Sequence, residues 1–251
     1  MSSRSVVLCY HAVAPVPAGA PLRHTFVPLE LFERQMEFLA GQRRVVGLDE
    51  IVAGPPESGP PRVAITFDDA YRSVLTRAAP VLERHGFEAT VFAPTAWLGD
   101  RNRWDPESDL EVDLMTGEEL VELSERGFAV ESHGHRHIDL SRATEGEIRE
   151  DVLASAGCIA DLLGRPPRYL AYPYGRSSEV ARRAVREAGF AEAFALEFQD
   201  VPFARSRTPI FPADSGWRFA FKASGRYAAL RRSRPVAGTY RLVRPLLRRG
   251  D

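Results

Sequence analysis

Two adjacent aspartates, Asp68 and Asp69, come directly after the apolar segment RVAITF (62–67). Neighbouring side chains leave a strand in different directions. One carboxylate can therefore bind a cation while the other accepts a proton from the water that the cation holds. Two unpaired carboxylates at the end of an apolar strand would be costly without a cation nearby. The structural alternative is that Asp69 caps a helix beginning near Tyr71.

Three histidines follow the segment FAVES, in the stretch SHGHRH (132–137). His133 and His137 have the i, i+4 spacing that lets two imidazoles face one point, whereas His135 is expected to point elsewhere. Two imidazoles and one carboxylate form a three-ligand catalytic metal site with an open position for water. Together with the aspartate pair, this spacing favours a metal centre over three histidines in a surface loop.

The elements that would position these residues alternate between short apolar runs and helical patterns. Thr116 with Glu119 and Thr144 with Glu147 form capping boxes that mark two helix starts. Strands separated by such helices pair in parallel through right-handed crossovers, and about seven units favour a single-domain (β/α) barrel over an open sheet. Neither of the two glycine-rich phosphate-binding patterns, GxGxxG and GxxxxGK(S/T), follows a predicted strand, so the sequence does not support a nucleotide-binding fold. The apolar runs are 6–13, 62–67, 89–94, 128–134, 169–175 and 191–197, and the helical patterns are 28–42, 71–86, 116–127, 144–165 and 177–190.

Three motifs, TFDDA, SHGHRHIDL and YLAYPYG, together resemble the polysaccharide deacetylase family, which is the NodB-homology domain of carbohydrate esterase family 4. The resemblance extends from about Val6 to Trp217. It implies a distorted (β/α)7 barrel and metal-dependent hydrolysis of N-acetyl or O-acetyl groups on sugars. Some members resemble a circularly permuted barrel in which the strand carrying His11 comes first.

The resemblance also implies roles for individual residues. Asp69, His133 and His137 would be the metal ligands, and Asp68 would be the general base. The backbone N–H of Tyr174 would help to hold the oxyanion. The cofactor would be one divalent cation, with zinc expected first and cobalt, nickel or iron also suited to these ligands.

The sequence departs from the family pattern at several positions. The late Leu-x-His motif is absent, and His11, at the end of VVLCY, is the candidate general acid. The arginine expected two residues before the proline of YLAYPYG is Ala171, and Arg207, tied to Asp214, could replace it. Gly134 stands where the family has a hydroxyl residue.

Charge is unevenly distributed along the 251 residues. Of 33 basic and 34 acidic residues, 12 basic and 2 acidic ones fall within 201–251, although the formal net charge is −1. We therefore divide the chain into a barrel (1–220) and a basic tail (221–251), helical or partly disordered. The tail could make peripheral contact with a membrane. No apolar run suits a signal peptide or membrane span, so we expect a cytoplasmic protein.

The leading functional hypothesis is an N-deacetylase acting on an acetylated amino sugar, a glycan or a lipid-linked precursor, without a nucleic-acid partner. Two alternatives remain open. The same site could hydrolyse another non-peptide C–N bond, as in a deformylase or a ureide amidohydrolase. The missing late histidine and the missing arginine also leave room for a catalytically silent glycan-binding module.

Overall fold

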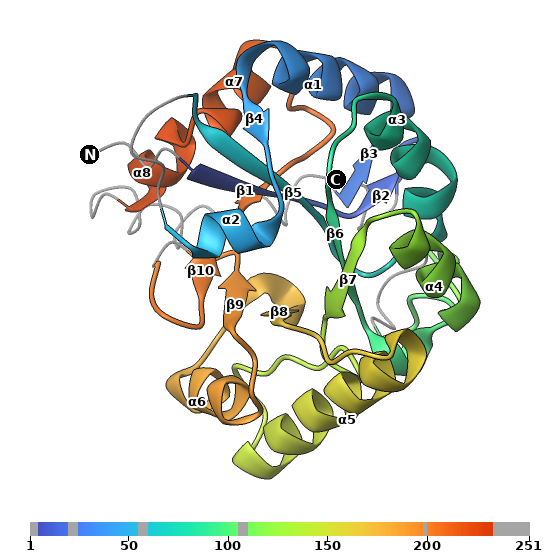
Figure 1. Cartoon of the computed structure of the whole chain (residues 1–251), viewed down its shortest axis with the longest axis vertical. Helices are drawn as coiled ribbons and strands as arrows, with labels where there is room; N and C mark the ends of the chain where they lie inside the picture. The colour runs from blue at the N-terminus through green and yellow to red at the C-terminus, as the bar shows by residue number, and fades with distance from the viewer. Residues whose placement is uncertain (1–4, 20–24, 55–59, 105–109, 198–199, 233–251) are drawn as a thin grey trace.

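A parallel sheet curves through the centre of the computed structural model, with helices around it (Figure 1). The structure describes residues 5–19, 25–54, 60–104, 110–197 and 200–232. The strands are β1 (Ser5–Tyr10), β2 (Ala12–Val13), β3 (Phe26–Val27), β4 (Arg44–Val45), β5 (Arg62–Phe67), β6 (Thr90–Ala93), β7 (Ala129–Ser132), β8 (Tyr169–Ala171), β9 (Glu192–Ala195), β10 (Arg205–Ser206) and β11 (Thr208–Pro209). The helices are α1 (Leu29–Gln42), α2 (Leu48–Val52), α3 (Ala79–Arg84), α4 (Gly117–Glu125), α5 (Glu145–Leu163), α6 (Glu179–Glu187), α7 (Trp217–Ala223) and α8 (Arg226–Arg232), with short helical turns η2 (Val74–Ala78), η3 (Thr95–Trp97) and η4 (Pro173–Gly175).

One short segment joins the two edges of the sheet. The strand order is β10-β9-β8-β7-β6-β5-β1-β11, and β10 and β11 are separated in sequence by Arg207 alone. Arg205–Pro209 thus pairs in parallel with β9 at its start and with β1 at its end. The backbone N–H of Arg207 donates to the carbonyl of Ala195 at 2.8 Å, and that of Ile210 donates to Cys9 at 2.9 Å. The result is the nearly closed (β/α) barrel, a single domain, that the sequence predicts.

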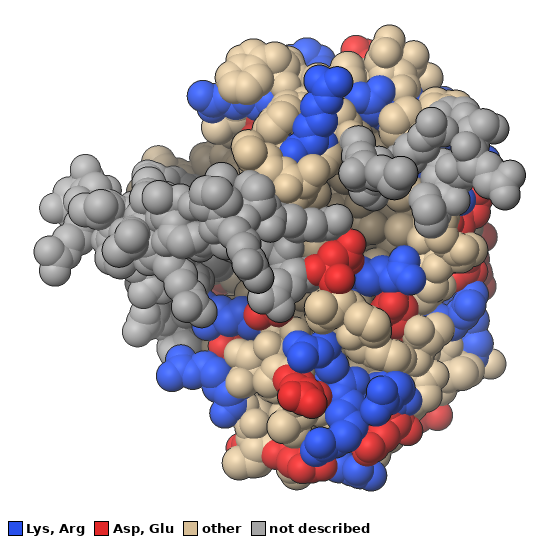
Figure 2. All heavy atoms as spheres, turned by 90° about the vertical axis from the view of Figure 1, so that its left-hand side faces the viewer, with Lys and Arg blue, Asp and Glu red and all other residues tan. Residues whose placement is uncertain are grey.

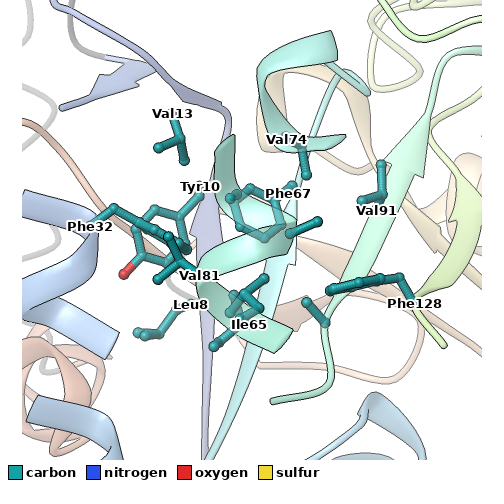
Figure 3. Packing of buried hydrophobic residues seen from close by; sticks show 14 of the residues in the cluster. Leu8, Tyr10, Val13, Phe32, Ile65, Phe67, Val74, Val81, Val91 and Phe128 are labelled. Carbon is teal, nitrogen blue, oxygen red and sulfur yellow. The ribbon is translucent and has the colours of Figure 1, made fainter. Parts of the chain in front are cut away.

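Alternation along the strands sorts side chains between the barrel interior and the outer helices. On β1, Leu8 and Tyr10 face outward and join a large apolar cluster with Phe32 of α1 and Phe67 of β5 (Figure 3). Val7 belongs to a separate, smaller cluster that contains Phe92 and Phe194 and fills the interior. The same alternation determines which polar residues at the strand ends face into the barrel.

Helix starts follow the local sequence, with one difference. Thr116 and Thr144 form the expected capping boxes at the first turns of α4 and α5. The helix expected over 71–86 is instead the π-helical turn η2 followed by α3. Pro80 has no N–H and its ring crowds the carbonyl four residues earlier, which accounts for the widened turn. Gly86 has a φ of 63°, as expected of a glycine that ends a helix.

The expected boundary at residue 220 falls inside α7. Phe219 and Ala223 of this helix are buried in the large apolar cluster, and residues 233–251 of the basic tail lie outside the described part of the chain. On the face shown in Figure 2, basic and acidic side chains are interspersed over the lower half. In the described part of the chain, no helix combines the length and apolar composition needed to cross a bilayer.

Candidate metal centre and active site

The polar residues that the sequence singles out meet at the carboxyl ends of the strands, where barrel enzymes carry their active sites. His11 follows β1, Asp68 and Asp69 follow β5, and His133 follows β7. Because every ladder of the barrel is parallel, these ends lie at one mouth of the barrel.

Asp69, His133 and His137 form a compact, buried triangle. One ligand atom from each lies within 4.8 Å of the others. Oδ1 of Asp69 is 3.3 Å from Nε2 of His133 and 3.2 Å from Nε2 of His137. Two ligands on a tetrahedral zinc ion, with bonds of about 2.0–2.1 Å, are separated by roughly 3.3–3.4 Å. The donor set and its spacing therefore fit a divalent cation.

Hydrogen bonding prepares His133 to be a ligand. Its Nδ1 lies 2.8 Å from the carbonyl oxygen of Ala171. Because a carbonyl only accepts, Nδ1 carries the proton, and the lone pair of the neutral ring is on Nε2, toward Asp69. A cation between the ring and the carboxylate would satisfy both groups.

His137 is held by aromatic rings. Trp104 stacks on it with ring centroids 4.3 Å apart and planes 29° from parallel, and Tyr174 meets it edge-on at 5.0 Å. Among the described residues, no group forms a hydrogen bond with its Nδ1. Burial lowers the pKa of His137, which favours the neutral, metal-binding form. No residue spacing in the sequence signals the contact between His137 and Trp104.

Backbone conformation is unusual at three site residues. Asp69, His137 and Tyr174 have φ values of 71°, 57° and 58°, in the left-handed region that non-glycine residues rarely adopt. Such conformations cost about 1–3 kcal/mol each and cluster where function requires them. Their concentration at one strand-end cluster marks it as the functional centre of the fold.

Arg207 binds Asp68 through both of its terminal nitrogens. Nη1 lies 2.6 Å from Oδ1 and Nη2 lies 2.7 Å from Oδ2. Burial raises the pKa of Asp68, but the charge of Arg207 and its hydrogen bonds outweigh this effect and lower the pKa to about 2. The carboxylate is therefore ionised at neutral pH, as a proton acceptor must be.

The expected tie between Arg207 and Asp214 is wrong. Oδ2 of Asp214 accepts instead from Nζ of Lys222 at 2.6 Å and from the backbone N–H of Phe211 at 2.8 Å. Arg207 reaches Asp68 because it occupies the segment that closes the barrel. The guanidinium thus comes from the residue between β10 and β11 and not from β8, where Ala171 stands.

His11 and Cys9 flank Asp68 on the side of β1. One ligand atom from each of the three residues lies within 4.8 Å of the others. Burial raises the pKa of the Cys9 thiol well above its usual range, so the sulfur keeps its proton and donates to Oδ2 of Asp68 at 3.3 Å. Because Arg207 already binds both oxygens of Asp68, this group is poorly suited to a second cation. No local pattern in the sequence signals the contact between Cys9 and Asp68.

Comparison with known proteins agrees with this arrangement. The sequence profile of the family described as polysaccharide deacetylase matches residues 56–193, which include the ligand triangle and Tyr174. A protein of Bacillus subtilis (strain 168), YxkH, provisionally named a polysaccharide deacetylase, is 25% identical over 222 residues, covering 85% of this chain and 74% of that protein.

A second group of relatives carries a more specific name. The poly-β-1,6-N-acetyl-D-glucosamine N-deacetylase of Staphylococcus aureus (strain MRSA252) is 27% identical over 144 residues, which cover 54% of this chain. The chain spans about half the length of that relative, at 48%. Among solved structures, IcaB from Ammonifex degensii has the same fold, with a TM-score of 0.73, 24% identity and coverage of 91% of this chain and 97% of that one.

Proposed function

Because this chain belongs to the polysaccharide deacetylase family, we propose that it is a metal-dependent hydrolase that removes N-acetyl groups from an amino sugar, a glycan or a lipid-linked carbohydrate precursor. One observation carries the proposal. An ionised, arginine-bound carboxylate, Asp68, directly precedes Asp69 in a ligand triangle whose spacing suits zinc. A base beside a metal ligand is what hydrolysis by water requires.

The residues of this chain divide the reaction among them. Asp69, His133 and His137 would hold the cation, which when bound acidifies water and polarises the acetyl carbonyl. Asp68 accepts the proton of the attacking water. The backbone N–H of Tyr174, in the tight turn of η4, donates to the oxygen on which negative charge develops.

We propose His11 as the general acid. It lies beside Asp68 at the end of β1 and is half-buried, within reach of both the site and solvent. An amine leaves poorly as an anion, so the departing nitrogen needs a proton. His11→Gln should therefore slow amide hydrolysis strongly and spare an activated ester, such as p-nitrophenyl acetate, whose phenolate leaves unprotonated. Equal losses on both substrates would remove His11 from this role.

The proposed substrate follows from the names of the relatives. N-acetylglucosamine in β-1,6 linkage is the first polymer to test, because the staphylococcal relatives are named for it. A lipid-linked precursor is the second substrate to test. We propose a cytoplasmic location, with membrane approach through the basic tail. Vesicle sedimentation of the full chain and of a chain ending at Arg231 tests that approach, and equal partition would refute it.

The deciding experiment measures acetate released from β-1,6- and β-1,4-linked N-acetylglucosamine oligomers. The purified protein is assayed as isolated, after chelation, and after restoring zinc, cobalt or nickel. Asp68→Asn should reduce the rate about 10²–10⁴-fold, whereas Asp161→Asn, on the exposed side of α5, should not change it. Acetate release that disappears on chelation and returns with metal supports the proposal.

The alternatives give different results in the same assay. Formylated sugars or cyclic ureides turned over in place of acetylated ones would identify another C–N hydrolase. Metal binding without turnover of any of these substrates would indicate a silent glycan-binding module.

A further inference from the structure

The loop between the two ligand histidines, Gly134–Arg136, donates its three consecutive backbone N–H groups to side chains. The N–H of Gly134 donates to Oγ of Ser132 at 3.1 Å, that of His135 to Oδ2 of Asp151 at 2.8 Å, and that of Arg136 to Oδ1 of Asp151 at 2.9 Å. The path of the chain from His133 to His137 is therefore determined by two acceptors.

Both acceptors depend on α5. Asp151 and Ser155 are one helical turn apart, so they lie on the same face of α5, and neither is exposed. Oγ of Ser155 lies 2.7 Å from Oγ of Ser132, the residue before the first ligand. The Nε of Arg136 adds a further contact to Oδ1 of Asp151, at 3.3 Å. A buried carboxylate is costly without such donors, and here the ligand loop supplies them.

Asp151 also accounts for Gly134. A Cβ at position 134 would lie 2.7 Å from Oδ2 of Asp151, which is closer than real Cβ atoms approach, and the φ of Gly134 is 75°. A residue with a hydroxyl, as in the family pattern, would collide with the carboxylate in this geometry. The glycine and the buried aspartate are thus complementary parts of one loop anchor.

The opposite edge of the loop is held by η3. The carbonyls of Gly134 and His135 accept from the backbone N–H groups of Thr95 and Ala96, at 3.2 and 2.9 Å. Nδ1 of His135 lies 2.8 Å from Oγ1 of Thr95, so this histidine is turned away from the ligand triangle. With its carbonyls bound on one side and its N–H groups on the other, the loop has little freedom to move either ligand.

We propose that Asp151 is a positioning residue for the metal centre, which fixes the orientation of His133 and His137 through the backbone between them. The inference rests on the proposed function, because it presupposes that the triangle binds a metal. Partners that orient metal ligands typically account for 10–100-fold in metal affinity. Asp151 touches no atom of the triangle and acts only through the loop.

The test compares Asp151→Asn with a matched control. The amide keeps the shape of the side chain but has only one acceptor oxygen for two backbone donors. Glu192 is the control, because it too is buried, accepts from two backbone N–H groups, those of Ala193 and Phe203, and binds an arginine, Arg205. Both N–H groups donate to Oε1 and Arg205 donates to Oε2, so Glu192→Gln removes the buried charge that Arg205 binds at the start of β9.

The readout is metal binding in the full chain. Zinc affinity is measured by competition with a chromogenic chelator, and the visible spectrum of the cobalt-loaded protein reports ligand geometry. We expect Asp151→Asn to bind zinc 10–100-fold more weakly and to change the cobalt spectrum. Glu192→Gln should match the wild type in zinc affinity and in the cobalt spectrum, even if it loses as much thermal stability as Asp151→Asn.

The outcomes separate the inference from the proposed function. Wild-type affinity and spectrum in Asp151→Asn would overturn the inference alone. Equal losses in both variants would assign Asp151 a general structural role and also overturn it. A wild-type chain that binds neither zinc nor cobalt would overturn the proposed function, and the inference with it. If Asp151→Asn does not fold, Ser155→Ala replaces it in the test, because it keeps the carboxylate of Asp151. Ser155→Ala should still weaken zinc binding several-fold. A zinc affinity equal to that of the wild type would count against the inference.

Discussion

Asp68 remains charged in a buried site because Arg207 donates to both of its oxygens. Without Arg207, burial would favour the protonated acid, which cannot accept a proton from water. The bidentate pairing also fixes the plane of the carboxylate, which a lysine at the same position could not do. Charge and orientation at this residue thus come from one contact.

Removing that contact should change the pH dependence of the reaction. In the wild type, the pKa of Asp68 is about 2, so its protonation should not limit kcat/KM above pH 5. In Arg207→Met, the lost charge should raise this pKa by about 1–3 units or more. The acid limb of the kcat/KM profile should then move to higher pH, into the measurable range. At pH 7, kcat/KM should be lower on the order of 100-fold, because the carboxylate is no longer held in its orientation.

Arg207→Lys and Arg126→Met complete this experiment. Lysine keeps the positive charge but cannot bind both oxygens of Asp68 with two nitrogens. The acid limb of the kcat/KM profile of Arg207→Lys should therefore lie between those of the wild type and Arg207→Met. Arg126→Met removes an ion pair with Glu83 on the outer surface and should leave the profile unchanged. A profile for Arg207→Met that falls in height without moving along the pH axis would contradict the assignment.

At the scale of elements, the sequence predicts those parts that depend on local patterns. Capping boxes at Thr116 and Thr144 and the strand-ending aspartates are local signals, and the structure shows each of them. The partner of Arg207 was missed because Asp68 lies 139 residues away, and no periodicity records which strand closes a barrel. In the sequence, Asp151 is an ordinary polar residue within a helical pattern. Only Gly134, where the sequence departs from the family pattern, indicated that something lies close to the loop between the two histidines.

The caps should contribute to stability without affecting the site. Oγ1 of Thr116 accepts from the backbone N–H of Glu119 at the start of α4. Thr116→Ala should lower the free energy of unfolding by about 1 kcal/mol and leave zinc affinity unchanged, as measured by urea denaturation and chelator competition. Thr76→Ala is the control, because Thr76 is exposed and caps no helix. A loss of stability equal to that of the control would contradict the capping role.

At the scale of the whole molecule, the C-terminal part of the barrel is fastened by a buried ion pair. Nζ of Lys222 on α7 donates to Oδ2 of Asp214 at 2.6 Å and to the carbonyl of Pro209, the last residue of β11, at 2.7 Å. The carbonyl of Asp214 accepts from Gln35 of α1, whose side chain also accepts from Tyr10 of β1. These contacts join the closing segment, the first strand and two outer helices.

Breaking this pair should destabilise the barrel. Lys222→Met leaves the carboxylate of Asp214 buried without a cation, so the free energy of unfolding should fall by about 3–5 kcal/mol. The double variant with Asp214→Asn should lose less than the sum of the two single losses. Urea denaturation of the four proteins measures both values. Strictly additive losses would show that the two side chains act independently.

The closing segment Arg205–Pro209 links the integrity of the barrel to its chemistry. Its two short ladders are joined only through the residue that keeps Asp68 ionised. Segments of a folded protein can open locally with free energies that extend from near zero up to that of global unfolding. Such an opening would withdraw the guanidinium from Asp68. We therefore expect local opening of this segment to inactivate the molecule reversibly while the rest of it stays folded. Exchange of the amide hydrogens of Arg207 and Ile210 would report how often this happens.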